Sequence, residues 1–172
     1  RRAAREQMWA MGLGHPLGQD RPRALLAVTG PDPIFDLDLA ALRAVRTATG
    51  LDFQTLRNAT PEALENRLER ARLLGRPIEL LHLAVHGDGE QITLGGRKLD
   101  AAWLSRHLDG VQVLLLAGCL SDQIGDWLGV VPHVVTLTDA LESDDVSRFT
   151  QAFWSGIGQG LHPSDALRQA LQ

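Results

Sequence analysis

The chain has 172 residues, 44% of them hydrophobic, and a formal net charge of −4. This length and apolar content are typical of one compact domain with its own core, and the negative charge argues against nucleic acid as the main partner. No run approaches the ~20 apolar residues that a membrane-spanning helix needs, and the N-terminus has no signal-peptide core, so a cytoplasmic protein without membrane contact is expected.

The N-terminal region differs in composition from the rest. Residues 1–23 combine a helix-prone start with several glycines and prolines, which is typical of a leader or linker. We therefore expect the folded domain to occupy residues 24–172.

Apolar strand-forming runs alternate with segments of helical periodicity along this domain. The predicted strands are residues 24–30, 52–58, 78–86, 111–118 and 132–138, with a small hairpin at 91–100. The predicted helices span 38–49 and 121–128, start at Pro61, after Asp100 and at Ser143, and close the chain at 162–172. Most of the strands are apolar on both faces, so the pattern predicts an α/β fold: a three-layer α/β/α sandwich with a mostly parallel central sheet.

Two of the strongest predicted strands end in reactive side chains. The run IELLHLAV leads into His86, and VQVLLLAG leads into Cys119, the only cysteine. Because ligands and catalytic groups gather at the carboxyl ends of parallel strands, neighbouring strands would place imidazole and thiol side by side. This is the arrangement of a cysteine nucleophile activated by a histidine.

The residues around this pair favour the same chemistry. Gly87 lets a substrate carbonyl approach the backbone, and its N–H, with that of Cys119, could stabilise an oxyanion. The predicted helix from Ser121 and a protonated His86 would both favour the thiolate.

Structural interpretations compete with this one. A lone cysteine at the end of an apolar strand is more often a small buried hydrophobe, and a lone histidine there is usually structural. Both residues at strand ends, each beside a glycine, favour catalysis. His82 and His86 would lie about 13 Å apart on a strand, too far for joint metal ligation, so His82 is expected to be a core histidine.

Three blocks of the sequence resemble the caspase-like cysteine peptidases, within them the bacterial CHAT branch. They are LLHLAVHG, VLLLAGC and the tail from HVVTLTDALESDD to the last helix. The resemblance implies a caspase-like fold, with His86 as general base, Cys119 as nucleophile, and Gly87 with the Cys119 backbone as oxyanion hole. A peptide bond would be hydrolysed through a thioester, without cofactor or metal.

The resemblance also bears on partners and specificity. It implies a protein or peptide substrate and a regulatory domain or partner protein, in an effector or processing domain of a larger bacterial stress or defence protein. Metacaspase-like relatives carry an aspartate two residues before the cysteine, where this chain has Ala117. Asp88, Asp122 and Asp139 are predicted at the substrate edge and could form an acidic pocket for arginine or lysine, or simply be solvated loop acids.

Two other functions are compatible with the sequence. One is a non-catalytic or autoinhibited caspase-like module that binds partner domains. The other is a hydrolase that uses the same pair of residues on a small ester or amide. Reactivity of Cys119 that depends on His86 would distinguish the first from catalysis, and a preference for small acyl substrates would indicate the second.

Overall fold

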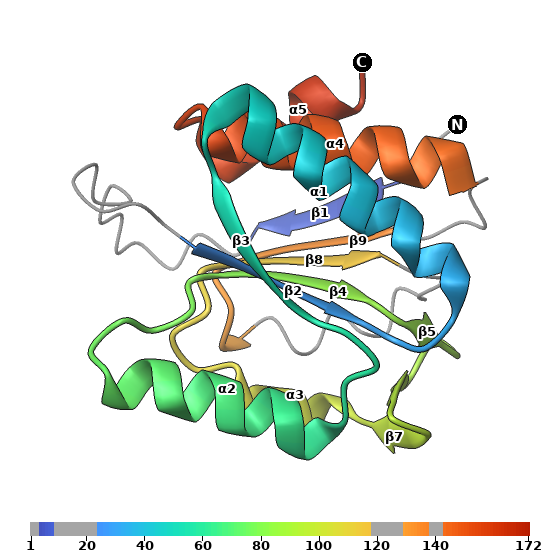
Figure 1. Ribbon diagram of the computed structural model, residues 1–172, viewed down its shortest axis with the longest axis vertical. Coiled ribbons are helices and arrows are strands. Elements are labelled where there is room, and N and C mark those ends of the chain that lie inside the picture. The colour runs from blue at the N-terminus through green and yellow to red at the C-terminus, as the bar shows by residue number, and fades with distance from the viewer. Residues whose placement is uncertain (1–3, 9–23, 118–128, 138–142) are drawn as a thin grey trace.

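The computed structural model describes residues 4–8, 24–117, 129–137 and 143–172. These residues form a three-layer α/β/α sandwich, in which helices cover both faces of one central sheet (Figure 1). The predicted fold class is therefore confirmed.

The central sheet contains six described strands in the order β1-β9-β8-β4-β2-β3. They are β1 (Ala4–Met8), β2 (Ala24–Thr29), β3 (Asp52–Leu56), β4 (Leu80–Ala84), β8 (Val113–Ala117) and β9 (His133–Leu137). Strands β9, β8, β4, β2 and β3 run parallel, and β1 pairs antiparallel with β9 at one edge. Strand β3 forms the other edge.

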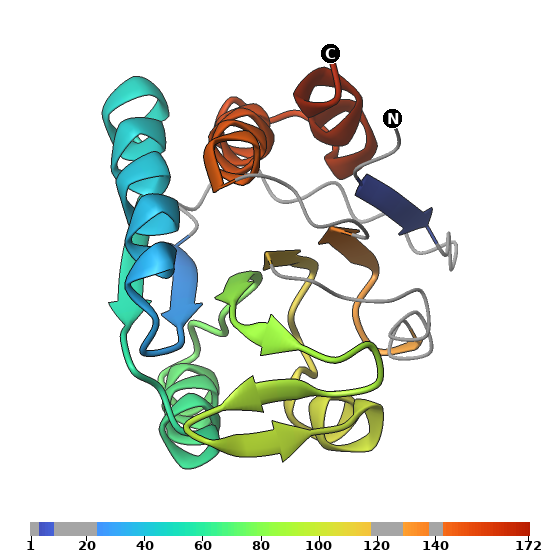
Figure 2. The ribbon, with the colours of Figure 1, turned by 90° about the vertical axis from the view of Figure 1, so that its right-hand side faces the viewer.

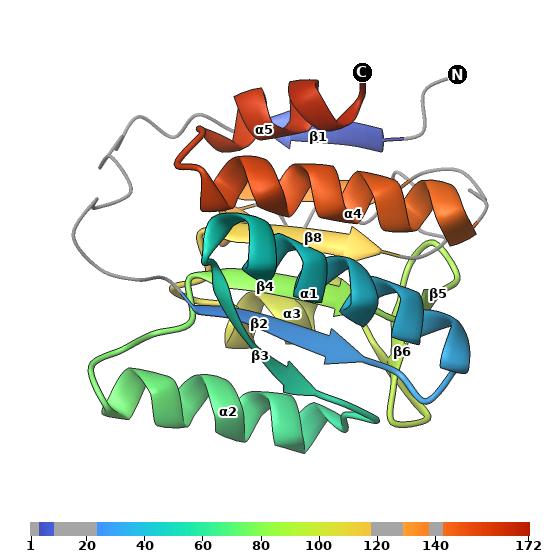
Figure 3. The same ribbon diagram turned by 45° about the horizontal axis from the view of Figure 1, so that its top comes forward.

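The helices divide between the two faces of the sheet. One face carries α1 (Asp36–Thr49), α4 (Ser143–Gly158) and α5 (Pro163–Ala170), and the other carries α2 (Pro61–Leu73) and α3 (Ala101–His107) (Figure 2). Figure 3 shows α1, α4 and α5 lying side by side across their face. None of the described helices is long and apolar enough to cross a membrane.

Each central strand supplies side chains to two cores, one on either face. On β4, Leu81 and Leu83 join the cluster under α2 and α3, whereas Leu80 and Ala84 join the cluster under α1 and α4. All four are fully buried. Because alternate residues of a strand point to opposite faces, burial on both sides explains the continuous apolar runs in the sequence.

Local sequence signals fix the helix ends. Thr60 Oγ1 accepts from the Ala63 N–H at 3.1 Å at the start of α2, and Asp100 Oδ1 accepts from the Trp103 N–H at 2.8 Å at the start of α3. Gly50 follows α1 with φ 75°, a left-handed conformation that favours glycine. These caps lie where the sequence predicts them.

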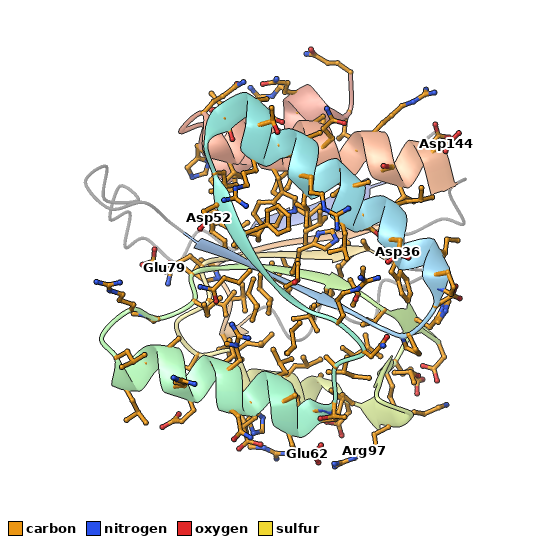
Figure 4. The ribbon with its side chains drawn as sticks, viewed as in Figure 1. Asp36, Asp52, Glu62, Glu79, Arg97 and Asp144 are labelled. Carbon is orange, nitrogen blue, oxygen red and sulfur yellow. The ribbon has the colours of Figure 1, made fainter. Side chains whose placement is uncertain are left out.

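A small antiparallel sheet projects beyond the carboxyl end of β4. It consists of β5 (His86–Gly87), β6 (Ile92–Leu94) and β7 (Arg97–Leu99). An ion pair between Arg97 and Glu62 connects this hairpin to the start of α2 (Figure 4). The predicted hairpin over residues 91–100 is thus confirmed, with a further short strand that includes His86.

Two details of the sequence prediction differ from the structure. The prediction of a helix-prone start within residues 1–23 is wrong for Ala4–Met8, because these residues form strand β1. The edge of β9 offers them backbone hydrogen bonds. The strand predicted at 78–86 ends at Ala84, and His86 belongs to β5. The helix predicted at 121–128 lies outside the described residues.

Candidate functional site

His86 lies at the carboxyl end of the central sheet, two residues beyond the end of β4. Val85 is 1% exposed and anchors the chain in the core, whereas the His86 side chain is 66% exposed. The strand therefore delivers the imidazole to the surface, as the sequence predicts.

The sheet topology marks this edge as a ligand site. From β2 the chain crosses to β3 on one side, and then to β4, β8 and β9 on the other, so the order reverses between β2 and β4. In open parallel sheets, ligands bind in the crevice at this reversal, outside the carboxyl ends of the strands. His86 follows one of these two strands, and Asp32 follows the other.

Asp32 is a site residue that sequence reasoning missed. Its Oδ2 lies 3.0 Å from His86 Nε2, and its Oδ1 accepts from the Ile34 N–H at 3.0 Å. The Ile34 N–H, and after it the hydrogen bond to His86, lower the pKa of the Asp32 carboxyl from its ordinary value. The carboxylate is thus ionised beside the imidazole at neutral pH.

A signal for Asp32 is present in the sequence, but it is weak. The turn Pro31-Asp32-Pro33 follows an apolar strand, as His86 does. Only the knowledge that β2 and β4 are neighbours makes this aspartate stand out among the other loop acids.

The second contact of His86 is aromatic. The centroid of the Phe35 ring lies 5.1 Å from that of His86, with 53° between the planes, and Phe35 itself is 7% exposed. Phe35 and Asp32 therefore limit the orientations of an otherwise exposed imidazole. In the part of the chain that the structure describes, His86 Nδ1 has no hydrogen-bond partner, so this nitrogen is available to another group.

Gly87, predicted to supply an oxyanion-hole N–H, lies in β5 opposite Ile92. The Asp88 N–H donates to the Gln91 carbonyl at 3.1 Å, which makes Asp88 and Gln91 a hydrogen-bonded pair. Since such pairs alternate along an antiparallel ladder, Gly87 and Ile92 form a non-hydrogen-bonded pair. The Gly87 N–H therefore points away from β6.

Asp88, predicted as one of three acids of a substrate pocket, is engaged within the hairpin. Lys98 Nζ donates to its Oδ2 at 2.8 Å, and the Glu90 and Gln91 N–H groups donate to its Oδ1. Lys98, followed by these two amides, lowers the pKa of Asp88 to about 2. The carboxylate already has a cationic partner.

The remaining predicted site residues, Cys119, Asp122 and Asp139, lie outside the described residues. The strand that leads to Cys119 is described, because β8 ends at Ala117, which pairs with Ala84 of β4. The two strands thus end level with each other at the edge that carries His86.

His82 does not belong to this exposed site. It is fully buried, and its Nδ1 accepts from the Trp154 indole N–H at 3.1 Å, which confirms the prediction of a core histidine. Within the described ranges, no group of three His, Cys, Asp or Glu side chains is placed to hold a metal ion.

The sequence comparisons identify the family. No curated protein matches the chain. The family model for the CHAT domain matches residues 1–172, the whole chain. With a parallel sheet covered by helices on both faces and a histidine at its carboxyl edge, the chain belongs to the CHAT domain family of caspase-like domains.

Proposed function

We propose that the protein is a cysteine endopeptidase in which His86 activates Cys119. The observation that carries the proposal is the Asp32–His86 contact at the reversal point of the sheet. Asp32 contacts Nε2 of the imidazole, so Nδ1 remains as the nitrogen that could contact a thiol.

The register of the sheet supports the pairing of these two residues. Ala84 of β4 pairs with Ala117 of β8. In the sequence, His86 comes two residues after Ala84, and Cys119 comes two residues after Ala117. Two residues of chain span at most about 7 Å, and this short separation in sequence from Ala117 supports the proposed pairing of Cys119 with His86.

In the proposed reaction the thiolate of Cys119 attacks the carbonyl carbon of a peptide bond. The carbonyl oxygen becomes negative and accepts hydrogen bonds from the N–H groups of Gly87 and Cys119. The C–N bond then breaks, the amine leaves with the proton that His86 took from the thiol, and a thioester remains. Water, deprotonated by His86, hydrolyses the thioester and restores the thiol.

Asp32 contributes to this cycle through His86. Its ionised carboxylate stabilises the imidazolium that forms when the thiol is deprotonated, and it fixes the ring orientation. Asp32 is therefore proposed as the orienting residue that completes the site.

Specificity for a basic side chain is a finer part of the proposal. Asp122 and Asp139 are its main candidates, because Asp88 already binds Lys98. The protein substrate, the regulatory partner and the role in a bacterial stress or defence pathway are proposed from family membership alone.

Alkylation of Cys119 tests the proposal directly, because the chain has one cysteine. A free thiol is only a few per cent thiolate at pH 7. We expect iodoacetamide to react at pH 7 at least about tenfold faster with the wild type than with His86→Ala. His107→Ala, which removes a half-buried histidine of α3, is the matched control and should react like the wild type.

Two outcomes would redirect the assignment. Equal, slow alkylation in the wild type and His86→Ala would contradict the dyad and favour a non-catalytic interaction module. A reactive thiol that hydrolyses small acyl esters but no member of a peptide library would indicate a small-molecule hydrolase.

A further inference from the structure

A second Asp–His contact lies beneath the exposed one. His82, Asp38, Thr150 and Trp154 form a buried polar group between the sheet and helices α1 and α4, which we call the inner cluster. Each of the four residues is at most 5% exposed. Thr150 Oγ1 donates to Asp38 Oδ1 at 3.2 Å, and His82 Nε2 lies 3.5 Å from the same oxygen.

The hydrogen bonds of the inner cluster fix the state of His82. An indole N–H can only donate, so His82 Nδ1, which faces Trp154 Nε1 at 3.1 Å, accepts and carries no proton. The ring proton is then on Nε2, which lies 3.5 Å from Asp38 Oδ1 but makes no hydrogen bond with any described residue. The two hydrogen bonds of the cluster therefore both come from α4, one from Thr150 to Asp38 and one from Trp154 to His82.

The inner cluster is not expected to add much to the folding stability of the protein. Burying a carboxylate costs several kcal/mol of solvation, and well-packed apolar replacements of buried ionic groups are often neutral or more stable. Asp38 is nonetheless 5% exposed, among side chains that are otherwise mostly apolar. A role in fixing one arrangement of the elements accounts better for its presence.

The inner cluster and the exposed site connect the same two segments of the chain. His82 lies in β4, and His86 follows that strand. Asp38 lies in the first turn of α1, and Asp32 and Phe35 lie in the short stretch that leads into that helix. The two described side-chain contacts of His86 thus come from the segment that the inner cluster ties to β4.

We propose that the inner cluster is a positioning unit for His86: by holding the start of α1 against β4, it keeps Asp32 and Phe35 in contact with the imidazole. The coupling runs through α4, because Thr150 and Trp154 of that helix make the hydrogen bonds to Asp38 of α1 and to His82 of β4. The catalytic meaning of this role depends on the function proposed above, but the positioning itself does not.

The test compares variants that disturb the inner cluster with variants that do not. Thr150→Val removes the donor to Asp38 at nearly constant shape, and Thr150→Ser restores a hydroxyl. Trp154→Phe removes the donor to His82 and keeps an aromatic ring, as a second variant should the first not fold. Val45→Ala, a buried truncation on α1, is the control for general loosening of that helix.

Two NMR readouts report the positioning without any need for activity. One is the nuclear Overhauser effect between the rings of His86 and Phe35, and the other is the pKa of Asp32. In Thr150→Val and Trp154→Phe we expect the ring contact to weaken and the lowered Asp32 pKa to rise toward its ordinary value. Thr150→Ser and Val45→Ala should match the wild type.

The reaction of Cys119 then shows whether positioning matters for chemistry. We expect Thr150→Val to slow alkylation at pH 7, and the double variant with Asp32→Asn to be no slower than Asp32→Asn alone, because both act through one contact. Unchanged NMR readouts in the cluster variants, or equal changes in Val45→Ala, would overturn the inference. Alkylation that is insensitive to His86→Ala would instead contradict the proposed function and leave the positioning result intact.

Discussion

At the scale of single residues, the carboxylate of Asp32 decides how His86 is held. Its two oxygens have separate tasks, since Oδ1 caps the turn through the Ile34 N–H and Oδ2 contacts the imidazole. A residue that both shapes its own loop and orients a neighbour couples the loop conformation to the chemistry of the site.

The variant Asp32→Asn tests this coupling. Asparagine keeps an acceptor oxygen but loses the charge that stabilises the imidazolium, so we expect Cys119 alkylation at pH 7 to slow by about ten- to a hundredfold. Asp36→Asn, which removes a nearby carboxylate that pairs with Arg57, is the control and should react at the wild-type rate. Equal rates in the two variants would show that Asp32 does not act on the site.

Asp88 gives a prediction on pH at the same scale. Lys98 holds the pKa of Asp88 at about 2, below its ordinary value of 3.8. The lowered pKa means that ionised Asp88 stabilises the folded protein at pH values above 3.8. This stabilisation is lost as the pH falls from about 4 toward 2, because the carboxylate then becomes protonated. We expect Lys98→Gln to raise the Asp88 pKa toward 3.8, as measured by carboxyl carbon shifts, and Arg97→Gln, which affects Glu62 instead, to leave it unchanged.

At the scale of elements, the β6–β7 hairpin is held against the loop before α2 as well as being attached to β5. Gly95 and Gly96 form its turn, with φ of 57° and 74°. A Cβ on Gly95 would lie 3.0 Å from Thr60 Cα and 3.1 Å from the Ala59 carbonyl oxygen, whereas one on Gly96 would meet nothing within 4 Å. The two glycines share a backbone conformation and differ in their surroundings.

Alanine substitutions at these two glycines separate the cost of the left-handed backbone from the cost of the contact with the loop before α2. Gly96→Ala should cost about 1–2 kcal/mol of unfolding free energy from the left-handed backbone alone. Gly95→Ala should cost more, because the neighbouring backbone must also move. Urea unfolding measures both, and a cost for Gly95→Ala equal to or below that of Gly96→Ala would show that the hairpin does not pack on this loop.

At the scale of the whole molecule, one sheet serves two cores. Leu83 of β4 packs under α2 and α3, and Leu80 of the same strand packs under α1 and α4, so neither layer of helices has a sheet of its own. If either layer of helices unfolds, one face of every central strand becomes exposed to water and the sheet is destabilised. The stability of each layer therefore depends on the other.

Hydrogen exchange tests this coupling within one protein. The amides of Leu68 in α2 and Phe153 in α4 belong to opposite layers, and both residues are buried. We expect the two amides to exchange with free energies of opening equal within about 1 kcal/mol, by global unfolding. Two clearly different values would mean that the layers open separately, so that no single unfolding free energy describes the chain.

The sequence by itself determined the elements and their environment. Helix caps at Thr60 and Asp100 depend on a side chain and a backbone N–H three residues away, and they lie where the sequence predicts them. The burial of His82 and the surface position of His86 both follow from the apolar run that contains His82 and ends just before His86. These properties depend on contacts or periodicities within a few residues, which a sequence displays directly.

Only the tertiary structure decided which distant residues meet. The order of strands places β2 beside β4, and this alone brings Asp32 to His86, 54 positions away. The contact between Thr150 and Asp38 spans 112 positions, and β1 forms only because β9 offers it an open edge. Such contacts depend on how whole elements pack and cross over, and no short stretch of sequence carries that information, because the same helices and strands are compatible with several sheet orders.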